Sequence, residues 1–175
     1  RLTSVKRHFL WSRPPGLLSL SSTCINDHLD QPSPRSLRSL ALLLSILELG
    51  AGCGVPGLSC ALSSSPSSVC ITDLNSETVS NASHNISLNG LTNATASVMD
   101  WCDSLTWPSS PQDFIVGADL VYSEDIVPLL RNVLSSLLKE GGAFLYVAPS
   151  DGREGLKVFI DELKGDEENW ECVLE

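Results

Sequence analysis

The sequence feature that most constrains the fold is the glycine-rich stretch GAGCGVPG at residues 50–57. It follows the apolar run LLLSILEL (42–49), which is typical of a parallel strand buried on both faces. Pro56 suits the first turn of a helix, and apolar residues then recur at helical spacing through Leu62. Glycine permits a tight turn and close approach of a ligand to the backbone. The stretch therefore predicts a strand, a turn that contacts a ligand, and a helix.

The same alternation of strand and helix continues along the chain. A strand–helix alternation of this kind predicts an α/β fold with a doubly wound, mostly parallel sheet. Ser123 is expected to cap the third of the helices that follow the turn, and Gly141 is expected to end it. The further predicted strands are 69–73, 95–100, 113–119 and 143–149, and the further predicted helices are 74–90, 123–142 and 152–165.

The two ends of the chain predict less regular structure. Residues 1–40 are expected to form an irregular N-terminal arm that covers the domain, because residues 12–36 are rich in Ser, Pro and Leu without a clean period. Residues 41–175 are expected to form the domain. Its last stretch, NWECVLE (169–175), resembles the start of a sixth strand. We expect the domain to be incomplete at its C-terminal end, without a closing strand, so that the sheet exposes an edge and apolar surface.

Polar and glycine residues follow the predicted strands. Ligands of doubly wound sheets bind beyond the carboxyl ends of the strands, near the point where the strand order switches. Residues just after each strand are therefore the candidate site. They are Glu48, Gly50, Gly52 and Gly54 after the first strand, Asp73 and Asn75 after the second, Asp100 and Trp101 after the third, and Asp119 and Tyr122 after the fourth.

These residue types fit an adenosine-bearing ligand. Asp73 lies about 20 residues past the glycine turn, the spacing at which a carboxylate accepts from ribose hydroxyls. Asp100 is placed to accept from an exocyclic amine, with Trp101 against the ring. GCGVPG (52–57) matches G-x-G-x-x-G, so an NAD-type oxidoreductase also fits. Glu48 beside the turn would repel a pyrophosphate but tolerate an ammonium and a sulfonium, which favours S-adenosylmethionine.

Longer stretches strengthen this interpretation. ILELGAGCGVPGLSCAL (46–62), VCITDLNSETVSNASHNISLNG (69–90), DW (100–101) and DFIVGADLVYSEDIVPLL (113–130) resemble the seven-strand methyltransferase-like family of protein lysine methyltransferases. The resemblance runs from about Ile46 to Val158. It implies the class I, Rossmann-like fold of S-adenosylmethionine-dependent methyltransferases.

The resemblance also implies roles for the candidate residues. Glu48 and the turn residues Gly50, Gly52 and Gly54 would shape the methionine end of the cofactor pocket. Asp73, with Asn75 beside it, would hold the ribose, and Asp100 and Trp101 would border the adenine. Trp11 would correspond to a tryptophan that the family carries upstream of the turn. Asp119 and Tyr122, in a D-x-x-Y block, would line the mouth where the substrate lysine enters.

We therefore expect an S-adenosylmethionine-dependent methyltransferase that methylates a lysine side chain of a protein. Within the same fold, a histidine-directed or small-molecule methyltransferase remains an alternative. So do a nucleotide (NAD-type) oxidoreductase and an inactive cofactor-binding relic or partner-binding module.

The composition limits the kinds of partner that this protein is expected to bind. The net charge of -10 argues against nonspecific nucleic-acid binding and suits a lysine-bearing protein surface. Residues 40–49 are too short for a membrane span, and no cysteine spacing predicts a metal site. We expect a monomer in the cytoplasm, with the nucleus as a second location. The basic stretch of residues 1–22 resembles a mitochondrial transit peptide, a less favoured alternative.

Overall fold

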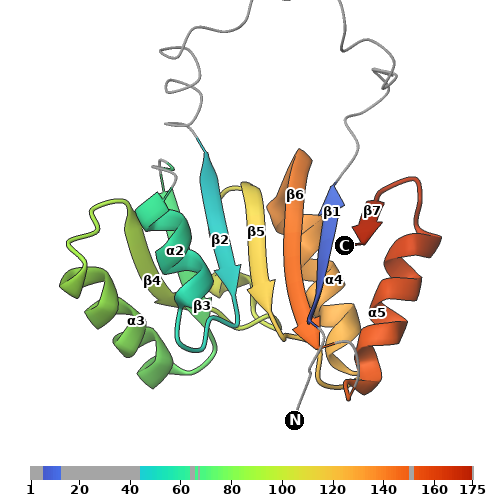
Figure 1. Ribbon diagram of the computed structural model, residues 1–175, viewed down its shortest axis with the longest axis horizontal. Coiled ribbons are helices and arrows are strands. Elements are labelled where there is room, and N and C mark those ends of the chain that lie inside the picture. The colour runs from blue at the N-terminus through green and yellow to red at the C-terminus, as the bar shows by residue number, and fades with distance from the viewer. Residues whose placement is uncertain (1–5, 13–43, 64–65, 67, 150–151, 175) are drawn as a thin grey trace, which may run out of the picture.

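The computed structural model describes residues 6–12, 44–63, 66, 68–149 and 152–174. They form a seven-stranded sheet in the order β4-β3-β2-β5-β6-β1-β7 (Figure 1). Strands β2 to β6 pair in parallel, whereas β1 pairs antiparallel with both β6 and β7. The strands are β1 (Lys6–Ser12), β2 (Ser45–Leu49), β3 (Ser68–Asp73), β4 (Ala94–Val98), β5 (Gln112–Ala118), β6 (Leu138–Pro149) and β7 (Glu171–Leu174).

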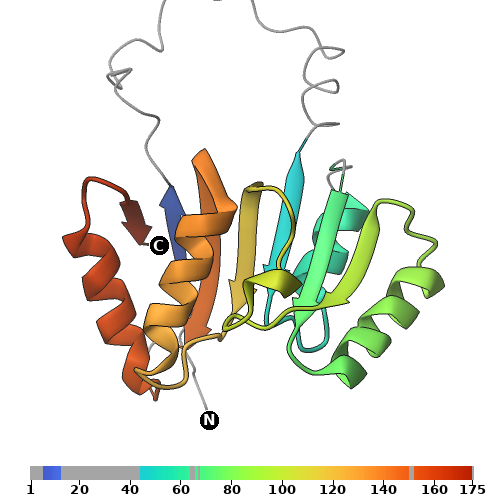
Figure 2. The same ribbon diagram turned by 180° about the vertical axis from the view of Figure 1, so that it is seen from behind.

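Helices cover both faces of this sheet. Two helices, α2 and α3, lie on one face, and α4 and α5 lie on the other (Figures 1 and 2). This is the doubly wound, mostly parallel α/β arrangement that the sequence predicts. Within the described ranges, no helix has the length and apolar character that crossing a membrane requires. The helices are α2 (Val55–Ser63), α3 (Ser76–Leu88), α4 (Ile126–Leu137) and α5 (Glu154–Gly165), with a short 3-10 helix η1 (Ser104–Thr106).

Each face of the sheet has its own hydrophobic core. On β2, Ile46 belongs to the core under α2 and α3, whereas Leu47 and Leu49 belong to the core under α4 and α5. Neighbouring side chains of a strand point to opposite faces, so both sets are buried. Phe144 and Tyr146 of β6 stack in the second core, with ring centroids 5.6 Å apart. Burial on both faces explains why the central strands read as continuous apolar runs.

An asparagine caps each end of α3. The Asn75 side-chain oxygen accepts hydrogen bonds from the N–H groups of Glu77 (2.8 Å) and Thr78 (3.4 Å), which is N-cap geometry. Asn89 is the C-cap, and Gly90 follows with φ +62°. The predicted stop at Asn89 and Gly90 is confirmed.

The helix after β5 is shorter than the sequence predicts. α4 begins at Ile126, and Asp125 precedes it without a side-chain cap hydrogen bond, so the prediction that Ser123 caps this helix is wrong. The helix ends at Leu137 because the next residue, Leu138, pairs with β5 at the start of β6. Gly141, with φ +74°, lies within β6, where the pairing with β5 shifts register, and not at a helix end.

Part of the predicted irregular arm is a strand. Residues 6–12 pair over their full length with residues 143–149 of β6, and residues 9–12 also pair with β7. The prediction that residues 1–40 are irregular is therefore wrong for residues 6–12, and an antiparallel strand does pair beside β6, with β7 as the terminal strand on that side. Sequence reasoning missed it because the partners of β1 lie at the far end of the chain. Residues 1–5 and 13–40 lie outside the described residues, whereas the predicted strand in 169–175 is confirmed as β7.

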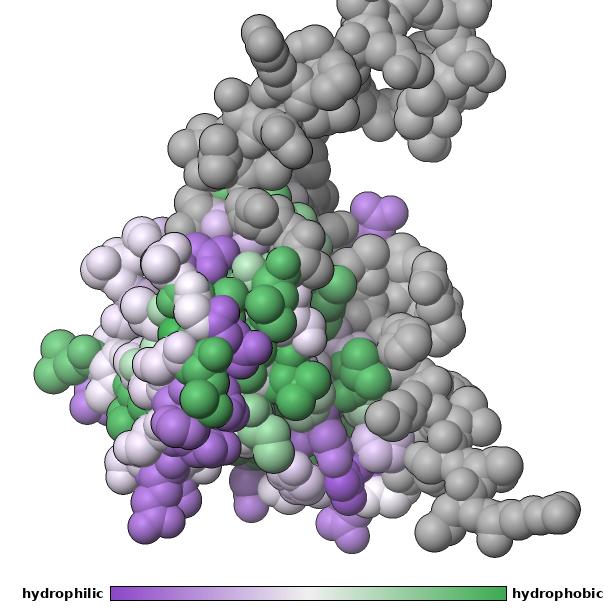
Figure 3. All heavy atoms as spheres, turned by 60° about the vertical axis from the view of Figure 1, so that its left-hand side comes forward, coloured by the Kyte–Doolittle hydropathy of each residue, from purple (hydrophilic) through white to green (hydrophobic). Residues whose placement is uncertain are grey.

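An exposed edge of the sheet lies at β4 and not beside β6. β4 is the terminal strand on the α3 side. Figure 3 shows hydrophobic side chains exposed among hydrophilic ones on this side of the molecule. Val98 at the end of β4 and Leu88 at the end of α3 are both exposed. Unpaired strand backbone and apolar side chains therefore meet on the β4 side.

The carboxyl ends of β2 to β6 meet at one edge of the sheet (Figure 1). From β2 the chain passes outward to β3 and β4, and it then returns to β5 on the other side of β2. The strand order therefore switches between β2 and β5. In sheets of this kind, ligands bind at that position.

Candidate active site

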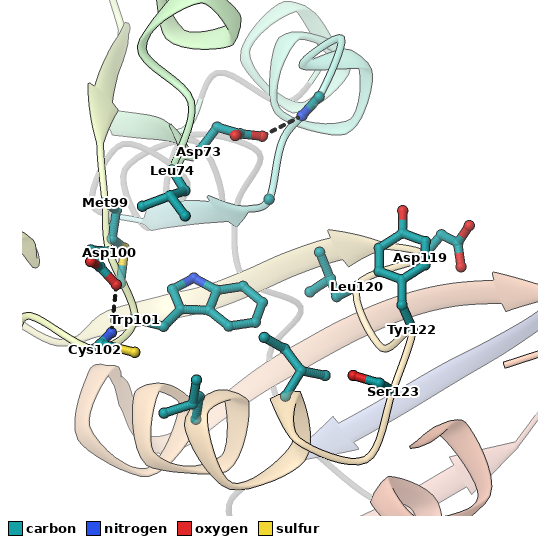
Figure 4. A pocket seen from close by; sticks show the side chains of 14 residues that line it. Asp73, Leu74, Met99, Asp100, Trp101, Cys102, Asp119, Leu120, Tyr122 and Ser123 are labelled. Carbon is teal, nitrogen blue, oxygen red and sulfur yellow. Dashed lines mark hydrogen bonds between the residues drawn. The ribbon is translucent and has the colours of Figure 1, made fainter. Parts of the chain in front are cut away.

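A cavity of about 560 Å³ opens at this switch point (Figure 4). Small-molecule sites in proteins typically occupy roughly 300–1,000 Å³. The lining residues come from the ends of four parallel strands and from the start of α4. They are Gly50, Gly52, Asp73, Leu74, Met99, Asp100, Trp101, Cys102, Asp119, Leu120, Tyr122, Ser123, Ile126 and Leu129.

The cavity brings together most of the residues that the sequence singles out. In Figure 4, Asp73 and Leu74 lie on one side and Asp119 and Tyr122 on the other, with the Trp101 ring between them in this view. The predicted residues among the lining are Gly50, Gly52, Asp73, Asp100, Trp101, Asp119 and Tyr122. Glu48, Gly54 and Asn75 lie close by but are not among the described lining residues.

The turn after β2 needs glycine for two reasons. Gly50 and Gly52 have φ of +54° and +51°, in the left-handed region that other residues rarely adopt. A Cβ on Gly50 would also lie 2.7 Å from Leu120 Cδ2, so a side chain there would force Leu120 to shift. Gly54 is buried, and its N–H donates to the Ala51 carbonyl (2.7 Å), which closes the turn.

Asp73 joins this turn to the end of β3. Its Oδ2 accepts from the Gly52 N–H and its Oδ1 from the Asn75 N–H, both at 2.9 Å. A carboxylate oxygen has two lone pairs, so both oxygens retain capacity to accept from a ligand at the cavity. The Asn75 side chain caps α3. A direct contact of that side chain with a cofactor stays a prediction.

Glu48 lies beneath the turn and not in the cavity. Its side chain is 1% exposed, and its Oε2 accepts from the Gly57 N–H at 3.0 Å. Burial raises the pKa of Glu48 to about 7, the Gly57 hydrogen bond opposes this rise, and the charge of Asp73 adds to it. Glu48 thus supports the first turn of α2 from below. The structure does not place its charge where it would repel a pyrophosphate in the cavity.

The turn after β4 is held by its own hydrogen bonds. Asp100 Oδ1 accepts from the Cys102 N–H (2.8 Å), and the Asp100 carbonyl accepts from the indole N–H of Trp107 (2.7 Å). The Asp100 N–H donates to the Thr106 hydroxyl (2.9 Å). Trp101 is half-buried and packs against the core under α4 and α5. Trp107 and Thr106 are supports that the sequence reasoning missed.

Asp119 has an ion-pair partner that the sequence did not reveal. Its carboxylate binds Arg153 through two hydrogen bonds, Nε to Oδ1 at 2.7 Å and Nη2 to Oδ2 at 2.5 Å. The Arg153 guanidinium also lies 4.7 Å from the centroid of the exposed Tyr122 ring. Asp119 has φ +54°, and its N–H donates to the Val147 carbonyl at 2.7 Å.

Two further residues that were not predicted fix the backbone from Asp119 to Ser123. The buried Tyr146 hydroxyl accepts from the N–H groups of Leu120 (2.9 Å) and Val121 (3.1 Å). Burial raises the pKa of Tyr146 to about 12, against the lowering effect of these hydrogen bonds. A Cβ on Gly155 would overlap the Ser123 carbonyl, so glycine there lets α5 pack on the turn. Arg153 and Gly155 follow β6, and extending the search to the end of that strand would have found them.

For Trp11, the structure gives the position of the backbone. It lies in β1 opposite Phe144, in the interior of β6, whereas the carboxyl end of β6 at Pro149 pairs with Lys6. The Trp11 backbone is therefore away from the edge that carries the cavity. Its contact with a cofactor stays a prediction.

The charge of the cavity is negative. Asp73, Asp100 and Asp119 line it, and none of the described lining residues is Lys or Arg. Among the described ion pairs, only Asp119 of these three has a cationic partner. The described residues also contain no group of His, Cys, Asp or Glu that could hold a metal ion. The cavity thus suits a cationic or neutral ligand.

Known proteins resemble this chain in sequence. A family described as lysine methyltransferase matches residues 23–166. Protein-lysine N-methyltransferase EFM2 of Saccharomyces cerevisiae is 30% identical over 81% of this chain and 38% of its own length. Protein N-lysine methyltransferase METTL21A of Xenopus tropicalis is 32% identical over 58% of this chain and 47% of its own length. This chain thus spans less than half the length of either relative.

A solved structure is similar in fold. It is an S-adenosylmethionine-dependent methyltransferase from Clostridium acetobutylicum, with a TM-score of 0.52 and 20% identity over 64% of this chain and 45% of that one. The sheet and its covering helices therefore have the class I methyltransferase fold. Together with the family match over residues 23–166, this shows that the chain belongs to the lysine methyltransferase family.

Proposed function

We propose that this protein is an S-adenosylmethionine-dependent methyltransferase that modifies lysine side chains of a protein substrate. The observation that carries the proposal is the convergence of Gly50, Asp73, Asp100, Asp119 and Tyr122 on one cavity at the switch point of the sheet. The names of the two relatives, both protein lysine methyltransferases, support the same activity.

The residues present fit this cofactor. Asp73 retains lone pairs at the cavity and would accept from the ribose hydroxyls. Asp100 and the half-buried Trp101 border the adenine, next to the apolar side chains of Leu74 and Met99. The absence of Lys and Arg from the described lining suits a sulfonium. When bound, S-adenosylmethionine supplies a methyl group activated by its attachment to positively charged sulfur.

The turn after β2 fits a dinucleotide less well. A pyrophosphate binds to free N–H groups of a glycine turn and of the following helix. Here the N–H groups of Ala51, Gly52 and Gly54 already donate to protein oxygens. The Gly57 N–H donates to the buried Glu48 carboxylate. The hydrogen bonding of the turn, more than the position of Glu48, therefore disfavours the oxidoreductase.

Asp119 and Tyr122 receive the substrate at the mouth of the cavity. A lysine arrives protonated, with an ordinary pKa of about 10.4. It must lose a proton to solvent, so that its lone pair would bond to the methyl carbon as the bond from that carbon to sulfur breaks. Partial burial of the amine beside a cationic group lowers its pKa and favours this loss. The Tyr122 ring flanks the amine and Asp119 orients it, so that placement supplies much of the rate.

The partner in this proposal is a protein with an exposed lysine. The net charge of -10 attracts a basic protein surface and disfavours nucleic acid. We place the protein, as a monomer, in the cytoplasm, with the nucleus as the second location.

Transfer of a labelled methyl group to a cell lysate tests the activity. The protein is incubated with lysate and isotopically labelled S-adenosylmethionine, and labelled residues are located by mass spectrometry. We expect label on a lysine, its loss with Tyr122→Ala, and its retention with Tyr122→Phe, which keeps the ring that flanks the amine. Label on histidine or on a small molecule would redirect the substrate class, and no label in any fraction would support an inactive relic.

A further inference from the structure

The mouth of the cavity already holds a cation. Arg153 binds the Asp119 carboxylate through two hydrogen bonds of 2.7 and 2.5 Å, and its guanidinium lies 4.7 Å from the centroid of the Tyr122 ring. A carboxylate beside an aromatic face is a pairing that recognises alkylammonium groups as well as guanidinium. The structure therefore shows that this position binds a positive charge.

The backbone at this position has supports other than Arg153. The Asp119 N–H donates to the Val147 carbonyl, and the Tyr146 hydroxyl accepts from the next two N–H groups along the chain. Gly155 brings α5 against the Ser123 backbone. These contacts hold the turn that carries Asp119 and Tyr122, so the guanidinium is available for a role other than support.

Arg153 is also placed to leave. Its side chain is 29% exposed, and it stands at the start of α5 without a side-chain cap hydrogen bond. Its remaining hydrogen bond, from Nη1, goes to the carbonyl of the adjacent Gly152 (3.3 Å). Movement of the side chain into solvent therefore buries no unpaired donor. The pair is partly exposed, so solvent screens it, although its two parallel hydrogen bonds make it stronger than an ordinary surface ion pair.

We infer that Arg153 is an internal competitor for the substrate's ammonium group. Its guanidinium fills the Asp119–Tyr122 site in the free protein, and a substrate must displace it. The identity of the incoming group as a lysine rests on the proposed function. A lysine amine is compact and does not reproduce the fork of hydrogen bonds that Arg153 makes. Arg153 thus selects for lysines that other contacts hold in place, and it is a specificity-determining residue.

Titration with n-butylammonium, observed through tyrosine, tests this inference without methyl transfer. The chain has two tyrosines, the exposed Tyr122 and the buried Tyr146, so ring-labelled tyrosine gives two NMR signals, with Tyr146 as an internal reference. We expect Arg153→Gln to lower the apparent Kd for n-butylammonium at Tyr122 about fivefold, which corresponds to about 80% occupancy of the site by Arg153. The neutral probe 1-pentanol should bind no better to the variant.

Arg131→Gln is the matched control. Arg131 is 32% exposed and pairs with Glu162 and Asp166, away from the cavity. It should leave the n-butylammonium titration unchanged. Adding Asp119→Asn to Arg153→Gln should remove the gain. Thermal unfolding checks that each variant is folded, and Arg153→Lys, which keeps one charge without the fork, should give an intermediate Kd.

An unchanged or higher Kd in folded Arg153→Gln would overturn the inference, because an internal competitor must improve binding when removed. The two proposals fail separately. If n-butylammonium binds as expected but no lysine is ever labelled, the cation site stands and the proposed function falls. If lysine is labelled but Arg153→Gln binds n-butylammonium no better, only the inference that Arg153 competes with the substrate is overturned.

Discussion

The two walls of the cavity hold their carboxylates in different ways. On the wall formed after β3 and β4, Asp73 and Asp100 accept from N–H groups two residues further along the chain, and neither has a described cationic partner. On the wall formed after β5, Asp119 binds Arg153, which lies 34 residues away. The first wall therefore keeps its negative charge for a ligand. The second already has a positive group that a ligand must replace.

This difference separates two tasks. A cofactor common to many enzymes can bind to local turns whose carboxylates stay available. Under the proposed function, a substrate site has to discriminate among many lysines, and the guanidinium of Arg153 would exclude those that bind too weakly to displace it. If the account is right, changes on the first wall alter cofactor affinity, and changes on the second alter substrate recognition with little effect on the cofactor.

The largest effect is expected from Glu48, beneath the glycine turn that Asp73 joins to the first wall. The Glu48 pKa is about 7 in the folded chain and 4.5 as its ordinary value, so the folded state binds more protons between these pH values. Stability contributed by this group therefore falls as the pH rises from 4.5 to 7. Glu48→Gln, which can still accept from Gly57, should gain up to about 3 kcal/mol over wild type between pH 5 and pH 8.

Urea unfolding of both proteins across this pH range measures the difference. The free energies of unfolding of the two proteins, plotted against pH, should lie close together near pH 5. They should separate up to about pH 7 and then run parallel. A constant offset at all pH values would show that Glu48 does not keep its proton in the folded chain.

Gly155→Ala perturbs the second wall from the side of α5. The new Cβ would overlap the Ser123 carbonyl, which is backbone and cannot rotate away. We expect a loss of about 2 kcal/mol in the free energy of unfolding. Gly165→Ala in the same helix is the control, because its Cβ would have no neighbour within 4 Å. Equal stability of the two variants in denaturant titrations would contradict the close packing of α5 on this wall.

Tyr146→Phe is expected to have a smaller effect on the same wall. It leaves the N–H groups of Leu120 and Val121 without their acceptor, at a cost of about 1–2 kcal/mol. Tyr122→Phe, whose hydroxyl is on an exposed ring, should change stability by less than about 0.5 kcal/mol. Affinity for S-adenosylhomocysteine should change less than about threefold in both variants. A large loss of that affinity in Tyr146→Phe would mean that the two walls are not independent.

The sequence allowed the first wall to be predicted more fully than the second. Gly50, Asp73 and Asp100 follow strands that are readable as apolar runs, and Asp73 and Asp100 each accept from an N–H group two residues further along the chain. The second bond of Asp73, from Gly52 at a separation of 21 residues, is not local in this sense. Arg153 and Tyr146 act through residues 34 and 26 positions away, and no local pattern shows such pairings. For the same reason β1 was missed, because its strand partners are in β6 and β7. Glu48 was correctly located at the turn. However, successive side chains of a strand point to opposite faces of the sheet, and that of Glu48 lies beneath α2 and not in the cavity.

The most direct test of the central claim is calorimetric titration of the intact protein with S-adenosylhomocysteine and with NAD. The account predicts binding of S-adenosylhomocysteine and none of NAD. It also predicts that Asp73→Ala weakens the first about tenfold or more, through the loss of charge-assisted hydrogen bonds. Asp161→Ala, which removes an exposed carboxylate on α5, should leave the affinity unchanged. Binding of NAD alone, or an unaltered affinity in Asp73→Ala, would contradict the account.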